Sequence, residues 1–502
     1  MVYPKADGLI EARDSSFILG SVGTGDAHLV INGHEVEVKP NGAFLAWLPV
    51  PDSASSRYDL VAYGAADTQR LSYPVRLMPS RRVIQDSLAR DTLAELKKPF
   101  PDSGHLVTLI ARDTTVPDTD RSVIARPVPG GTYKWFFLPG TQVRVVARSP
   151  GGWERVRLDA ALDVWVSTLD IRPYVAPPMP VKHKGRPKTP LPPTFEPDPR
   201  RVVGKVRVVP GRGWVDVVFN VGERPPFLVE ENGNELDVTF YGAQASTDII
   251  QYVGRNADSL AVPDTLVREV TWSQQTTDQA RFALQLSEEP YGYLVLWSGG
   301  NFVLRIRRRP TIDPSAPLRG LSIAVDPGHP PAGSTGPTGL YEAVATLAIS
   351  ERLDSILTAR GAHVIMTRTT ADPVALGARP VTARRAAADA MISVHLNALP
   401  DGINPYSSHG TGTYFFHQHS LALARSLETG LVRSMGLRDL GVHYDNLAVV
   451  RPTWMPAVLC EGAFVIIPEQ EAALRTAEFQ LRYAEGVANG LENYFRSLGG
   501  SR

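Results

Sequence analysis

Apolar and polar positions alternate on two length scales over the last 180 or so residues. Short apolar runs at 321–325, 363–366, 390–396 and 456–460 each stop at a turn or at polar residues, as strands do. Longer segments of helical periodicity at 342–360, 377–387 and 420–435, and a last one reaching about residue 495, lie among these runs. This order predicts an α/β domain over residues 318–498, with a mixed, largely parallel sheet covered by helices on both faces.

The first helical pattern of this domain also predicts which residues face the sheet. A stripe that holds Val344, Leu347 and Ala348 continues through Leu353, Ile356 and Leu357 and stops at Gly361. We therefore expect these six side chains to form the packed face of the helix.

The chain ahead of residue 310 has the period-two patterning and turn signals of all-β domains. Asn32-Gly33, Asn232-Gly233 and Gly299-Gly300 each separate two β-rich runs, which indicates hairpins. We predict an immunoglobulin-like sandwich at 1–80, a connector helix and an SH3-like barrel at 81–172, and a β-sandwich at 201–310. A proline-rich stretch at 173–200 separates the last two as a semi-rigid linker.

The composition of the chain argues against several classes of function and structural feature. The 52 Lys and Arg residues balance the 52 Asp and Glu residues over 502 positions, so a broad electrostatic grip on nucleic acid is not expected. The single cysteine, Cys460, allows no disulfide within the chain and lies in an apolar run, so we expect a packed core residue. No apolar run reaches about 18 residues, so no transmembrane segment is expected.

Four side chains with catalytic chemistry fall at the ends of predicted strands. His329 and Glu342 follow the first run of the domain, His395 lies in the 390–396 run, and Glu461 follows the 456–460 run. The carboxyl ends of parallel strands are where open α/β sheets bind ligands. Two imidazoles and one carboxylate commonly hold a catalytic zinc ion, and a second carboxylate nearby can move protons for amide hydrolysis.

The same residues carry a family resemblance. From about Leu318 to Phe495 the chain resembles the zinc-dependent N-acetylmuramoyl-L-alanine amidases, which cut the bond between the lactyl group of muramic acid and the first alanine of the peptidoglycan stem. The motifs, in the order seen in that family, are DPGH at 326–329, the helix-opening Glu342, HVIMTR at 363–368, Arg379 with Ala383, ISVHLNA at 392–398, GTGTYFF at 410–416 and PAVLCEGAF at 456–464.

The resemblance implies roles for individual residues. It makes His329, Glu342 and His395 the ligands of a Zn²⁺ cofactor and Glu461 the catalytic glutamate. Asn397 is placed to hydrogen-bond substrate, and Arg379 is a second candidate for substrate binding, for which we favour the role of a structural brace. The chain departs from the family pattern at Pro330, Arg384 and Ile467, which bears on loop shape and substrate contacts.

The upstream domains resemble modules that accompany such enzymes. Residues 140–166 are similar to a bacterial SH3-like barrel, and residues 201–310 are similar to the amidase N-terminal (AMIN) sandwich. The resemblance implies peptidoglycan, both glycan strand and stem peptide, as the partner, with anchoring to the wall through the β domains. It also implies the periplasm, the cell envelope or the exterior as location. Since residues 1–14 lack the apolar core of a secretory signal, we expect either that the signal has been removed or that Met1 is not the natural start.

Two other functions fit parts of the pattern. A zinc peptidase that cuts free peptides would use the same residues. A wall-binding protein with an inactive catalytic domain would account for the departures at Pro330, Arg384 and Ile467.

Overall fold

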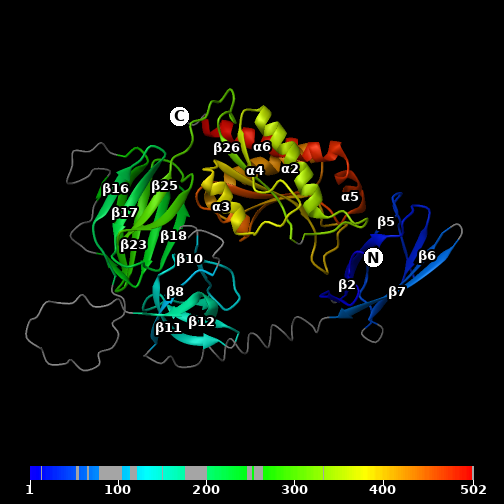
Figure 1. Ribbon diagram of the computed structural model, residues 1–502, viewed down its shortest axis with the longest axis horizontal. Helices are drawn as coiled ribbons and strands as arrows, with labels where there is room; N and C mark the ends of the chain where they lie inside the picture. Colours follow the sequence, from blue (N-terminus) through cyan, green and yellow to red (C-terminus); the bar gives the residue numbers. More distant parts are fainter. Residues whose placement is uncertain are drawn as a thin grey trace, which may run out of the picture. The chain divides into compact units, whose positions relative to one another are not determined.

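The computed structural model describes residues 1–12, 14–52, 56–64, 67–77, 104–112, 121–149, 151–175, 201–245, 252–253, 264–331 and 333–499. The chain forms two compact units, the first made of Met1–Leu96 together with Pro310–Arg502 and the second of Lys97–Arg309 (Figure 1). None of the described helices combines the length and apolar composition that a membrane crossing requires.

The C-terminal part of the first unit contains a six-stranded sheet in the order β27-β26-β28-β31-β29-β30. The strands are β26 (Ser322–Pro327), β27 (His363–Met366), β28 (Ala390–Asn397), β29 (Thr411–Phe415), β30 (Asp439–Tyr444) and β31 (Ala457–Phe464). Neighbouring strands are parallel except β29 and β31, which are antiparallel. The expected mixed, largely parallel sheet is confirmed, while β30 was not predicted because its sequence, DLGVHY, carries a glycine and two charged or polar residues.

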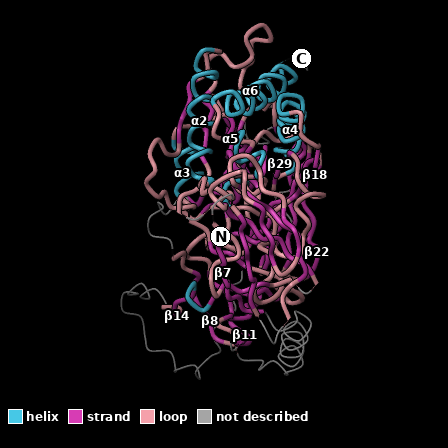
Figure 2. The backbone as a smooth tube through the Cα atoms, turned by 90° about the vertical axis from the view of Figure 1, so that its right-hand side faces the viewer, coloured by secondary structure: helices cyan, strands magenta, loops and turns pink. Residues whose placement is uncertain are grey.

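Helices cover this sheet unequally. They are α2 (Glu342–Ala359), α3 (Ala378–Arg385), α4 (Leu421–Met435), α5 (Pro468–Leu474) and α6 (Ala477–Gly499). Residues such as Ile323, Ile392 and Val458 share one core with α2, α4 and α6, whereas Ala324 and Met391 on the other face pack with α3 and the short turn η5 (Ala448–Val450). Figure 2 shows these helices gathered in one part of the chain.

The packed stripe of α2 differs from the predicted one. Leu353 and Leu357 are fully buried, which confirms the prediction for these two residues, but Val344 is 58% exposed and Ile349, which was not predicted, is fully buried. The displacement follows from two polar residues, because Glu342 and Thr346 occupy buried positions and the Thr346 hydroxyl donates to the carbonyl oxygen of Gly328 at 2.8 Å. The helix is therefore rotated so that its first turns face the strand ends, and the apolar pattern alone could not predict this.

The N-terminal part of the first unit is all-β. A five-stranded sheet has the order β1-β7-β6-β3-β4, and β2 pairs with β5. The bounds are β1 (Gly8–Ile10), β2 (Ser15–Ser21), β3 (His28–Ile31), β4 (His34–Val36), β5 (Ala43–Pro49), β6 (Arg57–Tyr63) and β7 (Thr68–Leu77). The hairpin at Asn32-Gly33 is confirmed by the pairing of Ile31 with His34.

The second unit is also all-β. Its smaller sheet has the order β13-β12-β11-β8-β14, beside the pair β10-β9. These strands are β8 (His105–Leu109), β9 (Val123–Ala125), β10 (Trp135–Phe137), β11 (Gln142–Ser149), β12 (Trp153–Arg157), β13 (Asp163–Ser167) and β14 (Ile171–Pro173). The connector helix predicted near 81–99 and the linker beyond 175 lie outside the described residues.

Two further sheets complete the second unit, in the orders β16-β17-β25-β24 and β18-β19-β23-β22-β21, beside the pair β15-β20. Their strands are β15 (Arg201–Val203), β16 (Val206–Pro210), β17 (Trp214–Asn220), β18 (Phe227–Asn232), β19 (Glu235–Tyr241), β20 (Ala243–Ala245), β21 (Tyr252–Val253), β22 (Val267–Thr276), β23 (Gln279–Leu286), β24 (Tyr293–Ser298) and β25 (Asn301–Arg307). The pairings of Asn232 with Glu235 and of Ser298 with Asn301 confirm the two predicted hairpins.

Candidate active site

The carboxyl edge of the six-stranded sheet collects the predicted site residues. His329 follows the last residue of β26 by two positions, Glu342 opens α2, and His395 and Glu461 lie near the ends of β28 and β31. His395 and Glu461 are partners in the parallel register of these two strands. Since register partners point to the same face, both side chains belong to the face that carries α3.

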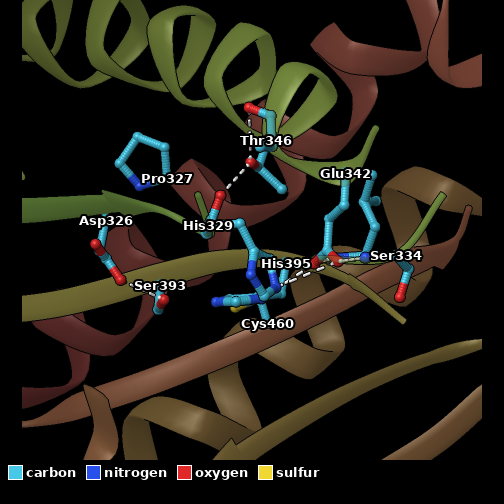
Figure 3. A network of polar contacts seen from close by, with 12 residues as sticks. Asp326, Pro327, His329, Ser334, Glu342, Thr346, Ser393, His395 and Cys460 are labelled. Atoms are coloured by element: carbon cyan, nitrogen blue, oxygen red, sulfur yellow. Dashed lines mark hydrogen bonds and ion pairs between the residues drawn. The ribbon is translucent and has the colours of Figure 1, made fainter. Parts of the chain in front are cut away.

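His329, Glu342 and His395 converge. Nε2 of His329 lies 3.3 Å from Oε2 of Glu342, and Nδ1 of His395 lies 3.1 Å from Oε1 of the same carboxylate. One ligand atom from each residue falls within 4.8 Å of the others, and no other such cluster occurs among the described residues. In Figure 3 the Glu342 carboxylate reaches from the start of α2 towards the imidazole of His395 on β28.

Main-chain donors fix the Glu342 carboxylate from both sides. The Ser334 amide donates to Oε2 at 2.9 Å, and the Leu396 amide donates to Oε1 at 3.0 Å. Burial opposes ionisation of Glu342, but the contacts with His329 and His395 outweigh it and hold its pKa well below the usual range. The interaction with Glu342 also raises the pKa of His329. The cluster is thus built around an ionised carboxylate.

The donor set fits a zinc ion. Two ligand atoms held tetrahedrally at about 2.0–2.1 Å from zinc lie about 3.3 Å apart. The separations of 3.1 and 3.3 Å around Glu342 match this spacing. Two imidazoles and one carboxylate also leave a fourth position for water, as in catalytic zinc sites.

Glu461 has the environment of an acid–base group. Its Oε2 is buried and has no hydrogen-bond partner among the residues that the structure describes. Burial and the nearby charge of Glu342 raise the pKa of Glu461 well above its ordinary value. A buried carboxylate oxygen without a partner is costly, which fits a group whose partner is a ligand or a reacting molecule.

Arg379 supports the loop that carries His329. Its guanidinium donates to Oδ1 of Asp326 at 2.9 Å and to the carbonyl oxygens of Pro327, His329 and Pro330 at 2.8, 3.0 and 3.0 Å. The residue is only 3% exposed. These contacts fit the brace favoured above for Arg379, because its donors are directed at the loop.

The brace also stabilises an unusual backbone conformation. His329 has a φ of 56°, in the left-handed region that costs a non-glycine residue about 1 kcal/mol or more. The bond from Arg379 to the His329 carbonyl acts on this residue directly. Asp326 in turn accepts from Ser393 at 2.6 Å, so the loop is tied to β28.

Two tyrosines near the site carried no signal in the sequence. The Tyr414 side chain on β29 hydrogen-bonds Asn397, and burial and then the Glu461 charge raise its pKa. The Tyr483 hydroxyl on α6 lies 3.1 Å from the carbonyl oxygen of His395 and 2.8 Å from that of Cys460, and it accepts from the Gly462 amide. Only the register of β29 and the packing of α6 reveal these contacts.

The three departures from the family pattern have structural positions. The Pro330 carbonyl accepts from Arg379, and Arg384 lies on α3. Ile467 is 6% exposed and precedes α5 within the apolar core. Cys460 is buried, as expected of a packed residue.

The C-terminal domain matches known proteins. Residues 323–493 match the family described as N-acetylmuramoyl-L-alanine amidase. The uncharacterized protein YqiI of Bacillus subtilis is 30% identical over 198 residues, which are 38% of this chain and 93% of YqiI. The probable cell wall amidase LytH of Staphylococcus epidermidis is 31% identical over 187 residues, 36% of this chain and 61% of LytH.

The N-acetylmuramoyl-L-alanine amidase LytC of Bacillus subtilis is 31% identical over 36% of this chain and 36% of its own length. Among solved structures, the catalytic domain of the amidase CwlV from Bacillus (Paenibacillus) polymyxa is 31% identical, covering 35% of this chain and 97% of that domain with a TM-score of 0.33. The matched segment thus spans less than two thirds of LytH and LytC.

Proposed function

Because the chain belongs to the N-acetylmuramoyl-L-alanine amidase family through residues 323–493, we propose that it hydrolyses the amide bond between the lactyl group of N-acetylmuramic acid and L-alanine in peptidoglycan. The observation that carries the proposal is the convergence of His329, Glu342 and His395 beside Glu461. Three metal ligands can hold an ion that activates water, and a further carboxylate can transfer the protons that amide hydrolysis requires.

His329, Glu342 and His395 are the proposed zinc ligands. A zinc ion bound there would lower the pKa of water to about 7 and polarise the carbonyl group of the substrate. The amides of Ser334 and Leu396 orient Glu342, and Arg379 positions His329, so the ligands are set before any ion binds.

Glu461 is the proposed acid–base residue. In our proposal its carboxylate takes the proton of the attacking water and then delivers it to the departing alanine nitrogen. A carboxyl group with a raised pKa is suited to the second step, because it holds the proton until the amine leaves. The register pairing of Glu461 with His395, a proposed zinc ligand, supports this role.

Asn397 is the proposed substrate-binding residue. It ends β28, two positions after His395, and Tyr414 holds its side chain through a hydrogen bond. An amide group oriented in this way can bond an acetamido or peptide group of the substrate next to the ligands.

The β domains upstream are proposed to attach the enzyme to the wall. The assignments as immunoglobulin-like, SH3-like and AMIN-like modules, and a location in the periplasm, the envelope or outside the cell, belong to this proposal. Its support is that LytH is named a probable cell wall amidase.

Product analysis tests the proposed reaction. Purified peptidoglycan is digested with the full chain, and the products are identified by mass spectrometry. Release of intact stem peptides with a free N-terminal L-alanine, together with peptide-free glycan, supports the amidase. Cleavage inside the stem would point to the peptidase, and no cleavage by zinc-loaded protein to an inactive wall-binding protein.

A further inference from the structure

The N-terminal β domain of the first unit packs directly on the catalytic domain. Phe17, Leu19 and Leu45 belong to the same apolar core as the six-stranded sheet. The Tyr406 hydroxyl donates to the carbonyl oxygen of Leu45, and Lys39 forms an ion pair of 2.7 Å with Glu469 of α5. The two parts therefore form one continuous body.

Asp401 is the centre of this contact. Its carboxylate accepts from the Tyr3 hydroxyl, from the Glu11 amide at 2.8 Å and from the Ser16 hydroxyl at 3.2 Å. Asp401 follows the end of β28 by four positions. The strand that carries His395 thus continues into the segment to which the β domain is attached.

A groove of about 480 Å³ runs along this contact. From the catalytic domain it is lined by residues 333–335, 398–401 and 466, and from the β domain by Val2, Tyr3, Lys5, Leu9, Glu11, Phe17 and Leu19. One of the lining segments, residues 333–335, touches two of the proposed metal ligands. The Ser334 amide bonds Glu342, and Gly333 lies so close to His329 that an added Cβ would be 2.9 Å from its ring.

We propose that this groove binds the stem peptide of peptidoglycan, so that the N-terminal β domain forms one wall of the substrate site. This inference rests on the proposed amidase function. The groove starts at the loop that carries Ser334 and Glu342, and a peptide bound along it would extend away from the scissile amide.

The chemistry of the lining favours a peptide over a glycan. Nine of the fifteen lining residues have apolar or aromatic side chains, including Leu9, which is 40% exposed, and such side chains suit alanine methyl groups. The Asp401 carboxylate accepts three hydrogen bonds from the β domain, so its oxygens are already engaged within the protein. Among the described lining residues Lys5 is the one cation, beside the carboxylates of Glu11 and Asp401, and its exposed ammonium group suits a carboxylate of the stem.

Substrate pairs test the proposal. Two soluble muramyl peptides are compared that differ only in a stem carboxylate or its carboxamide. We expect the wild-type protein to prefer the acid by about tenfold in kcat/KM, and Lys5→Met and Lys5→Glu to remove this preference through KM, since a charged hydrogen bond is lost. Arg70→Glu, a charge reversal on exposed β7 outside the groove, should retain the preference.

The result that overturns the proposal is an acid-to-amide ratio in Lys5→Glu equal to that of the wild type. Inhibition by peptide-free glycan that weakens in Lys5→Glu would also overturn it, because the groove would then hold sugar. If the wild type cleaves no muramyl peptide, the amidase function fails. The groove is then judged by calorimetry with the acidic stem peptide, which should bind the wild type about tenfold tighter than Lys5→Glu.

Discussion

His395 of β28 and Glu461 of β31 are register partners in adjacent parallel strands, so a proposed zinc ligand and the proposed acid–base residue lie side by side on one face of the sheet. This relationship depends on the pairing of two strands, and 59 residues of the chain lie between them. Five predictions test this site and the parts of the fold that support it.

Loss of the Arg379 brace should destabilise the protein. Arg379→Ala leaves the buried Asp326 carboxylate without its ion-pair partner, at a cost of about 3–5 kcal/mol in the free energy of unfolding. Urea unfolding of the variant measures this. Arg385→Ala, on the exposed side of the same helix, should change stability by less than about 0.5 kcal/mol. Equal effects of the two substitutions would refute the brace.

Tyr483→Phe should lower turnover while zinc content stays the same. The substitution removes a hydroxyl that contacts the carbonyl oxygens of His395 and Cys460, and it leaves the Gly462 amide without its acceptor. We expect a loss of about 1–3 kcal/mol in stability and a fall in kcat. Tyr444→Phe, at a tyrosine 63% exposed, is the matched control. Wild-type kcat in Tyr483→Phe would show that these hydrogen bonds are not needed to hold the ends of β28 and β31 in their active positions.

Asp401→Ala should loosen the N-terminal β domain. The Glu11 amide donates to Asp401, so its hydrogen exchange should accelerate, by about tenfold or more if the lost bond contributes 1.4 kcal/mol or more. Hydrogen exchange followed by NMR or mass spectrometry measures this. Glu35→Ala, an exposed position on β4, should leave the exchange rate unchanged. Unchanged protection in Asp401→Ala would contradict the attachment.

Stability should fall with rising pH because of Glu428. Burial and the neighbouring Asp439 carboxylate raise its pKa from 4.5 to about 8. Between about pH 4.5 and pH 8 the folded state holds a proton that the unfolded state has lost, so stability falls by up to about 1.4 kcal/mol per pH unit. Glu428→Gln has no titrating proton at this position and should flatten this slope. Unfolding series at pH 5 to 9 compare the two proteins, and parallel curves would refute the prediction.

Local patterns predicted much of the fold. The hairpins at Asn32-Gly33 and Asn232-Gly233 appeared where the turn residues placed them, because their signal lies within a few residues. The same holds for α2, whose start at Glu342 and end before Gly361 follow from local signals. Its buried face was displaced because Thr346 is drawn to the Gly328 carbonyl, a contact that no periodicity contains.

The site was also predictable only in part, because some of its contacts join residues that are far apart in the chain. His329, Glu342, His395 and Glu461 stand out because they lie near strand-like runs within motifs of the family that the chain resembles, and the structure brings the first three together. Tyr483, by contrast, lies 88 residues from His395 in the chain. The contact of the N-terminal β domain through Asp401 spans 398 residues from Tyr3, so only the packed structure reveals it.

The central claim is that zinc is held by His329, Glu342 and His395 while Glu461 moves the proton. Its most direct test is zinc content by elemental analysis, measured with peptidoglycan turnover, in Glu461→Gln and His395→Ala. Glu461→Gln should keep about one zinc per chain and lose at least a hundredfold in kcat, because proton transfer contributes 10²–10⁴-fold. His395→Ala should lose both zinc and turnover. Full turnover in Glu461→Gln, or full zinc content in His395→Ala, would contradict the account.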